Sequence, residues 1–260
     1  MRVSTIAVQA TGPHAMYWRF HDAVAQAQLS SWLGHAGRRL VDISGPASRA
    51  AMLAAAAGHR VLHVADPHDI DHGTHGAALH DGASAPLEAT AEPPRYRTVT
   101  ADGSGLEFLA DGCVDGIIAE DRTLSRRLAA ETLVSEIRRV LRPGGRVLAC
   151  VDSLTQGMAM LAEQHHWPQL IDLPHADVVL VPWPDGTITR CYGTEQLREL
   201  FASGGFEVNW IRSRTALSAS TVNYLLARDP GSFRRLVQVE LTSSADDSVG
   251  SQLVISASRR

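Results

Sequence analysis

The sequence predicts an α/β fold with a doubly wound, mostly parallel sheet. Two observations carry this prediction. Residues 39–66 read as a strand, a glycine turn, a helix and a second strand, and short apolar runs alternate with helical stretches later in the chain. A crossover between two such strands is nearly always right-handed, so the strands are parallel and buried. Ligands of these sheets bind beyond the carboxyl ends of the strands, here beside Ser44 and Asp66.

The bounds of the strand–helix–strand unit at residues 39–66 are predicted from the residues at which its apolar runs end. The strand expected at residues 40–43 ends in a Ser-Gly-Pro turn, which continues neither a strand nor a helix. Residues 47–57 are mostly alanine, a strong helix former, and a glycine follows as a stop signal. A second apolar strand is expected at residues 61–65 and ends at Asp66.

Apolar spacing and turn residues also predict the elements of the rest of the chain. Residues 5–34 carry apolar side chains at helical spacing and are expected to form one or two lid-like helices. Residues 67–94 are polar, with at most one short helix. In a helix at residues 126–141, Leu128 and Leu133 are expected to share the inward face. The other strands are expected at residues 96–99, 114–119, 146–151, 178–181, 188–191, 206–211 and 253–257, and the other helices at 106–109, 157–167, 195–202, 220–227 and 231–241.

The length of 260 residues favours one domain with a full core over two small domains. Within this domain we expect four parts. They are N-terminal lid helices at residues 1–36, a ligand-binding half at 37–156, an inserted segment at 157–192 and a C-terminal half at 193–260.

Composition limits the partners and the setting. A formal net charge of -4 and the absence of a Lys/Arg run argue against nucleic acid and against an anionic membrane surface. The three cysteines are odd in number and widely spaced, which favours a reducing compartment. No apolar run is long enough for a membrane helix, and the N-terminus has no leader pattern. We therefore expect a soluble, cytoplasmic protein.

Four segments of the sequence, taken together, resemble one family. They are LVDISGP with VLHVAD, TADGSGLEFLADGCVDGIIAED, EIRRVLRPGGRVLACVDS and EQLRELFASGGFEV. Their order and spacing resemble the class I S-adenosylmethionine-dependent methyltransferases of the small-molecule type, over residues 40–259. The resemblance implies a Rossmann-like sheet of seven strands with the last one antiparallel. It also implies S-adenosylmethionine as cofactor and methyl transfer to an O, N or C atom of a small-molecule substrate.

The resemblance also implies roles for the acidic residues at the strand ends. S-adenosylmethionine carries ribose hydroxyls and an adenine amine but no phosphate, so carboxylates suit it. Asp66 is placed to accept the ribose hydroxyls, and Asp102 matches the carboxylate near the adenine amine. Asp42, a charge inside a buried strand, matches the residue that holds the glycine turn near the amino acid tail. The other cofactor-binding candidates are Ser44, Gly45, Pro46, Pro67, Gly103, Glu120, Asp121 and Tyr17.

Ordinary structural roles are open for the same acids. Asp66 also suits a loop or a cap, Asp102 an Asp-Gly turn, and Glu120 with Asp121 the solvated start of a helix.

The glycine loop departs from the family pattern. Where the family has GxGxG after the acidic residue, this chain has a single glycine, Gly45, followed by Pro46. That departure keeps a second hypothesis open, a non-catalytic methyltransferase-like binding or regulatory protein. A pyrophosphate needs the backbone N–H groups of such a loop even more, so a nucleotide-dependent oxidoreductase using NAD ranks third.

Histidines supply the candidate catalytic base. If the acceptor is a hydroxyl, His165 and His166 in the inserted segment are where a base would lie, although a pair of surface histidines is the simpler interpretation. The histidines of residues 63–80 have no fixed ligand frame such as HExxH, so no metal site is predicted. Among protein partners, a homodimer is left open.

Overall fold

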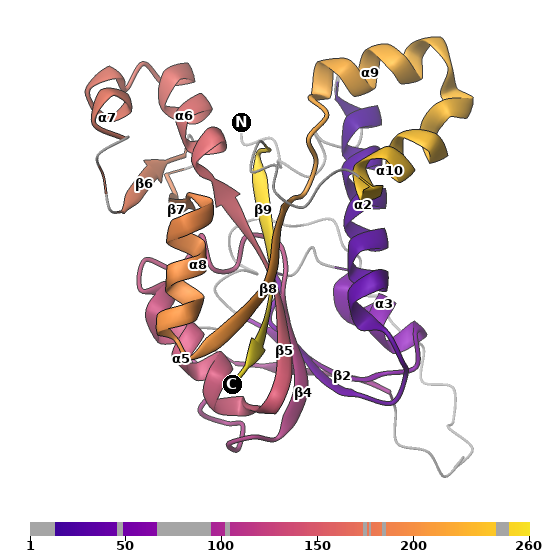
Figure 1. Ribbon diagram of the computed structural model, residues 1–260, viewed down its shortest axis with the longest axis vertical. Helices are drawn as coiled ribbons and strands as arrows, with labels where there is room; N and C mark the ends of the chain where they lie inside the picture. The colour runs from indigo at the N-terminus through magenta and orange to yellow at the C-terminus, as the bar shows by residue number, and fades with distance from the viewer. Residues whose placement is uncertain are drawn as a thin grey trace.

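The computed structural model describes residues 14–45, 49–66, 95–101, 105–173, 176, 178–183, 186–242 and 250–260. A central sheet is covered by helices on both faces, with α2 (Ala15–Leu33) and α3 (Ala50–Ala56) on one face and α5 (Ala130–Val140) and α8 (Thr194–Ser203) on the other (Figure 1). This arrangement confirms the predicted doubly wound α/β fold.

Five parallel strands form the first part of the sheet. In the middle, β1 (Arg39–Asp42) pairs with β2 (Arg60–Ala65) on one side and with β4 (Val114–Ala119) on the other. Outside them, β3 (Tyr96–Thr100) pairs with β2, and β5 (Leu141–Ser153) pairs with β4. Their order is β3-β2-β1-β4-β5, and all of their carboxyl ends lie at one edge.

The last strand of the chain completes this sheet in the opposite direction. β9 (Gln252–Arg259) pairs antiparallel with β5 and also with β8 (Phe206–Ser213). The main part of the sheet therefore runs β3-β2-β1-β4-β5-β9-β8, which is seven strands in which β9, the last strand of the chain, is antiparallel to the others. That is the topology implied by the family resemblance.

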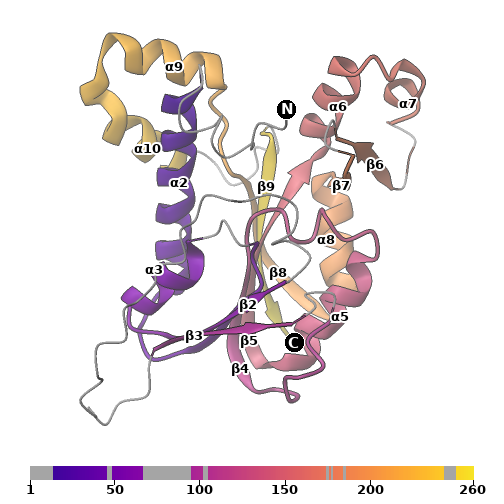
Figure 2. The ribbon, with the colours of Figure 1, turned by 180° about the vertical axis from the view of Figure 1, so that it is seen from behind.

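The inserted segment extends the sheet at the carboxyl end of β5. β6 (Val179–Pro182) and β7 (Ile188–Tyr192) form a hairpin, and β7 pairs in parallel with the last two residues of β5. Two short helices, α6 (Leu154–Glu163) and α7 (Trp167–Asp172), pack on this hairpin around an apolar cluster of their own. Figure 2 shows the segment beyond the end of the sheet.

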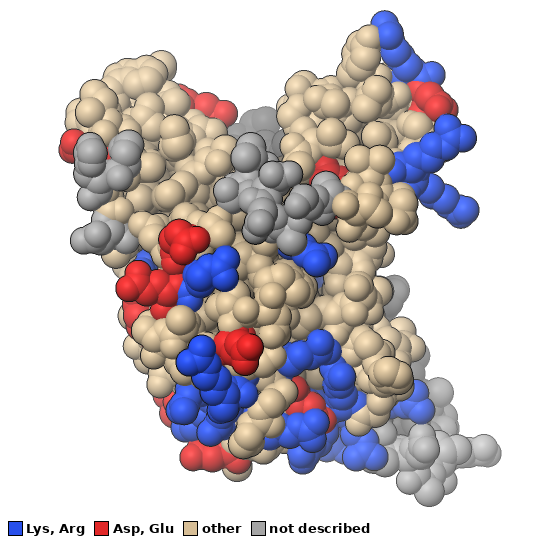
Figure 3. Space-filling view, in the orientation of Figure 1, with Lys and Arg blue, Asp and Glu red and all other residues tan. Residues whose placement is uncertain are grey.

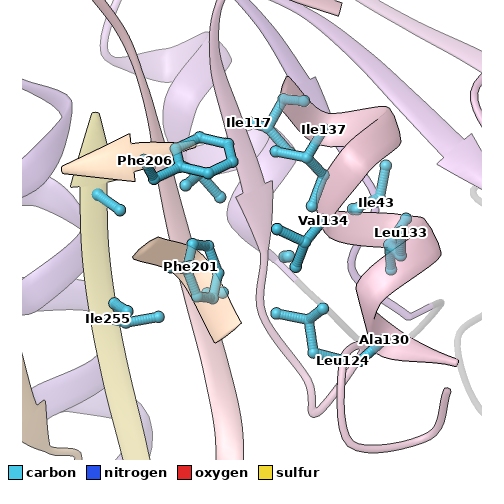
Figure 4. Close-up of a cluster of buried hydrophobic side chains, with 14 of the residues drawn as sticks. Ile43, Ile117, Leu124, Ala130, Leu133, Val134, Ile137, Phe201, Phe206 and Ile255 are labelled. Atoms are coloured by element: carbon cyan, nitrogen blue, oxygen red, sulfur yellow. The ribbon is translucent and has the colours of Figure 1, made fainter. Parts of the chain in front are cut away.

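The larger core lies under α5 (Ala130–Val140) and α8 (Thr194–Ser203). In Figure 4 the apolar face of α5 points toward the sheet, and Phe201 of α8 lies beside Phe206 of β8. The two phenyl rings meet edge to face with centroids 5.5 Å apart, a favoured aromatic geometry. The other face is covered by α2 (Ala15–Leu33) and α3 (Ala50–Ala56), whose small alanines allow close packing.

The N-terminal and C-terminal helices pack together beside the sheet. Phe20 and Val24 of α2 are buried against α9 (Ala219–Arg228) and α10 (Phe233–Thr242). Between the last two helices, the Asp229 carboxylate accepts the N–H of Gly231 at 3.0 Å as a cap. Residues 15–33 thus form one of the one or two helices expected at residues 5–34, and its role as a lid stays a prediction.

The predicted helix before β5 was wrong in extent. The helix expected at residues 126–141 begins only at Ala130, and Leu128 is 57% exposed instead of inward. The preceding turn is fixed at Ser125, whose hydroxyl accepts the N–H of Asp152 and whose carbonyl accepts the N–H of Arg190. These bonds to β5 and β7 hold the backbone in a turn before the helix can start.

The helix expected at residues 106–109 is a turn. Arg139 on α5 donates to the carbonyl oxygens of Leu106 and Leu109, both at 2.8 Å, and to the Asp111 carboxylate at 2.7 Å. These hydrogen bonds from Arg139 hold residues 106–109 in a turn against α5.

Charged side chains are distributed unevenly over the surface. Every basic residue of the chain except histidine is an arginine. In Figure 3 they gather at the lower end of the molecule and along the outer side of α9 and α10. Within the described part of the chain, we find no helix with the length and apolar character needed to span a membrane.

Candidate cofactor site

Three carboxylates lie at the carboxyl ends of three adjacent parallel strands. Asp42 ends β1, Asp66 directly follows β2, and Glu120 directly follows β4. Because these strands are neighbours in register, their ends meet at one edge of the sheet. The edge predicted from the sequence is therefore where the structure places these side chains.

The turn after β1 is bonded to the end of β4. Asp42 is fully buried, its Oδ1 accepts the N–H of Ser44 at 2.9 Å, and its Oδ2 lies 3.5 Å from Nδ1 of His63. The Ser44 hydroxyl in turn accepts the N–H of Glu120 at 2.8 Å. Buried polar groups are stable only when bonded in this way, so Asp42 and Ser44 fix the shape of the turn.

Gly45 lies directly under the loop that follows β4. A Cβ atom at this position would come 2.5 Å from the Asp121 carboxylate, a distance that real contacts do not reach. Asp121 and Arg122 both have positive φ, 55° and 65°, which is uncommon for residues with a side chain. Strained backbone of this kind concentrates at functional sites. The single glycine of the loop thus lies in close approach to the Asp121 side chain, which would have to move if residue 45 carried a Cβ atom.

Asp66 is bonded to an arginine from the same loop. Its Oδ2 lies 3.0 Å from Nη2 of Arg127, and the two side chains are 10% and 28% exposed. Arg127 follows β4 in sequence, so it reaches past the end of β1 to the end of β2. The acid predicted to bind ribose therefore lies at the predicted edge, already paired with a cation of its own chain.

Glu120 is paired with a buried arginine that the sequence did not indicate. Arg214, which follows β8, is 1% exposed and donates to the Glu120 carboxylate and to Oε1 of Gln28 on α2, the latter at 2.7 Å. Burial alone lowers the pKa of this guanidinium, but Glu120 and Cys150 outweigh it and raise the pKa. Arg214 therefore stays charged. Its bonds to Gln28 and Glu120 connect α2 to the end of β4.

A second arginine pair lies on the side of the inserted segment. Arg122 donates to Oδ2 of the buried Asp152 through Nε at 2.9 Å, and its guanidinium lies 4.1 Å from the centroid of the Trp183 ring. Burial raises the pKa of Asp152, and the Arg122 charge opposes that rise. The sequence did not indicate this pair, because its members are 30 residues apart.

Replacing Arg122 with leucine should destabilise the protein in a pH-dependent manner. A carboxyl whose folded-state pKa is raised contributes stability below its unfolded-state pKa and loses it as the pH rises through the folded-state pKa. Without Arg122 the pKa of Asp152 rises further, so the deficit in unfolding free energy should be about 1–2 kcal/mol at pH 7 and smaller near pH 4. Urea unfolding of wild type and variant at pH 7 and at pH 4 measures this difference in unfolding free energy.

The matched control is Arg198→Leu, which removes an exposed arginine that lies 3.7 Å from Glu195. It should change stability by less than about 1 kcal/mol. An equal deficit for Arg122→Leu at both pH values would contradict the assignment of the Asp152 charge.

The remaining candidates lie in other surroundings. Tyr17 is buried, and its hydroxyl lies 3.0 Å from that of Thr215 in the packing between α2 and the segment after β8. His165 is exposed in the turn after α6, with its ring 5.8 Å from that of Trp167, and His166 precedes α7. Among the described residues, neither histidine has a hydrogen bond or ion pair to the strand-end carboxylates, and their part in catalysis stays a prediction.

Several predicted positions fall outside the described residues. They are Pro46, Pro67, Asp102 and Gly103, together with the histidines from residue 68 to 80. In the part of the chain that the structure describes, there is no group of three or more His, Cys, Asp or Glu side chains arranged to hold a metal ion. Burial raises the pKa of the Cys150 and Cys191 thiols to about 12, so neither is an activated nucleophile.

Comparison with solved structures identifies the fold. A 1,6-didemethyltoxoflavin-N1-methyltransferase of Burkholderia thailandensis, solved with its substrate and S-adenosylhomocysteine, aligns over 100% of this chain and 92% of its own, with 17% identity and a TM-score of 0.53. The fold is that of the class I S-adenosylmethionine-dependent methyltransferases.

Other proteins with this fold carry out different reactions. A geranyl diphosphate C-methyltransferase of Streptomyces coelicolor aligns over 91% of this chain and 77% of its own, with 16% identity and a TM-score of 0.52. The [4+2]-cyclase SpnF covers 91% of this chain and 80% of its own, also with 16% identity and a TM-score of 0.52. The sequence matches no family model and no curated protein. At these identities the likeness establishes the fold, and the reaction has to be argued from the site.

Proposed function

We propose that this protein is an S-adenosylmethionine-dependent methyltransferase that acts on a small molecule. The observation that carries the proposal is the position of Asp42, Asp66 and Glu120 at the carboxyl ends of β1, β2 and β4 in a methyltransferase fold. A ligand of such a sheet binds at this edge, and carboxylates there favour a ligand with hydroxyl and amine donors over a phosphate.

The residues present fit this cofactor. Gly45 provides a turn where a side chain would collide with the Asp121 carboxylate, and Asp42 holds that turn through the N–H of Ser44. Asp66 is the acid expected to take the ribose hydroxyls, since it follows β2. S-adenosylmethionine, when bound, supplies a methyl group already activated on a sulfonium.

The protein's own residues then have to position the acceptor. The strand ends and the inserted segment meet at Arg122, Asp152 and Trp183, a cluster fixed by an ion pair and an aromatic contact. We propose that this cluster of side chains orients a small acceptor. Orientation is the main contribution of the enzyme here, because the methyl group of the cofactor is already activated on the sulfonium. His165 and His166 are the proposed source of a base if the acceptor is a hydroxyl.

A second candidate function is a methyltransferase-like protein that binds a ligand without transferring a methyl group. One observation favours it, namely that Asp66 is already neutralised by Arg127. For such a protein the strand-end acids serve the fold, and S-adenosylhomocysteine binds weakly or not at all.

Calorimetric titration of the full chain with S-adenosylhomocysteine tests the proposal. We expect saturable binding with a Kd below about 1 mM, the usual upper range for enzyme ligands. NADH serves as the comparison ligand and should give no saturable heat, because the turn at Gly45 lacks the glycines that a pyrophosphate requires. No binding of S-adenosylhomocysteine would favour the second candidate, and binding of NADH alone would reject both.

A further inference from the structure

The Asp66 carboxylate faces two sets of hydrogen-bond donors. In the protein itself, Arg127 donates to Oδ2 at 3.0 Å across 61 residues of sequence. Under the proposed function, the ribose hydroxyls of the cofactor donate to the same carboxylate. A guanidinium beside a carboxylate forms a strong, charge-assisted bond, particularly where both groups are largely removed from water. The two partners therefore compete for one acceptor.

The loop that carries Arg127 has a fixed base and a more open end. The Thr123 hydroxyl donates to the carbonyl oxygens of Ile43 and Glu120, and Leu124 and Ser125 are fully buried. Further along, the side chains of Arg126 and Arg127 are 40% and 28% exposed. The Arg127 side chain can therefore change rotamer while the base of the loop keeps its bonds.

We infer that Arg127 weakens ligand binding at the proposed nucleoside site, because a ribose must displace it from Asp66. This inference rests on the proposed function. A vicinal diol offers two donors in exchange for the guanidinium, whereas a single hydroxyl offers one. Arg127 therefore lowers the affinity for every nucleoside whose sugar bonds to Asp66, and it does so by the same factor for riboses and deoxyriboses, because the same ion pair is broken.

Titration of the full chain with adenosine tests this inference with an uncharged probe. Arg127→Gln should tighten adenosine binding about 3–10-fold, the range expected for one partly exposed ion pair that the ligand must break. The gain for 2′-deoxyadenosine should be similar in fold-change, because the same ion pair is broken, so the variant is compared with wild type for both nucleosides. S-adenosylhomocysteine is titrated in parallel.

Two matched variants separate the ion pair from a general loss of positive charge. Arg126→Gln removes the neighbouring arginine, which lies 3.7 Å from Asp121, and Arg142→Gln removes an arginine paired with Asp115 at the other end of β4. Both should leave the Kd for adenosine within about twofold, since neither touches Asp66. Tightening by Arg126→Gln equal to that by Arg127→Gln would overturn the inference.

The Asp66→Asn variant tests whether Arg127 acts through Asp66. There the amide no longer holds the guanidinium as an ion pair, so adding Arg127→Gln should change the Kd by less than about twofold. If wild type binds S-adenosylhomocysteine but Arg127→Gln leaves adenosine binding unchanged or weaker, the inference fails and the proposed function stands. If none of the proteins binds either ligand, both fail.

Discussion

Arg214→Ala should lower the free energy of unfolding by about 3–5 kcal/mol, the usual cost of removing one partner of a buried ion pair. Arg214 is 1% exposed and bonds both Glu120 and Gln28, so its loss leaves the Glu120 carboxylate without its cation at the end of β4. For a chain of this length the melting temperature should fall by roughly 10 °C. Differential scanning calorimetry and urea unfolding both measure the effect.

A surface arginine provides the comparison for this variant. Arg198→Ala on α8 removes a half-exposed arginine near Glu195 and should change stability by less than about 1 kcal/mol. A cost below 1 kcal/mol for Arg214→Ala would show that the pair does not stabilise the strand end as described.

The second large effect is expected at Asp66. Asp66→Asn should weaken S-adenosylhomocysteine binding by about 2–3 kcal/mol, because a carboxylate accepting ligand hydroxyls forms stronger bonds than a neutral amide. That loss corresponds to a factor of about 30–150 in Kd. Isothermal titration calorimetry measures the affinity, and the melting temperature without ligand checks that the variant is folded.

An acid outside the site serves as the matched control. Asp111→Asn changes an exposed aspartate that pairs with Arg139 in the turn before β4, and the affinity should stay within about twofold of wild type. The same small change for Asp66→Asn would remove Asp66 from the ligand site and would favour the non-catalytic interpretation.

The fold was predictable because its signals are local. Apolar runs that stop at glycine, proline or aspartate marked β1, β2 and β4 nearly at their observed bounds. The antiparallel last strand followed from the family resemblance and is confirmed by the pairing of β9 with β5. The positions of Asp42, Asp66 and Glu120 at one edge follow from the order of parallel strands alone.

The ion pairs of the site were not predictable because their partners are distant in sequence. Arg127 and Asp66 are 61 residues apart, and Arg214 and Glu120 are 94 apart. No periodicity distinguishes the buried Arg214 from the exposed Arg212 two positions earlier. The same holds for the turn before α5, where bonds from β5 and β7 to Ser125 override a helical pattern.

A crystal structure of the protein grown with S-adenosylhomocysteine tests the central claim most directly. The account predicts the nucleoside at the carboxyl ends of β1, β2 and β4, with its ribose hydroxyls on the Asp66 carboxylate and the Arg127 side chain turned away. A nucleoside bound elsewhere, or a ribose at this edge that leaves the bond between Arg127 and Asp66 unbroken and makes no contact with Asp66, would contradict it.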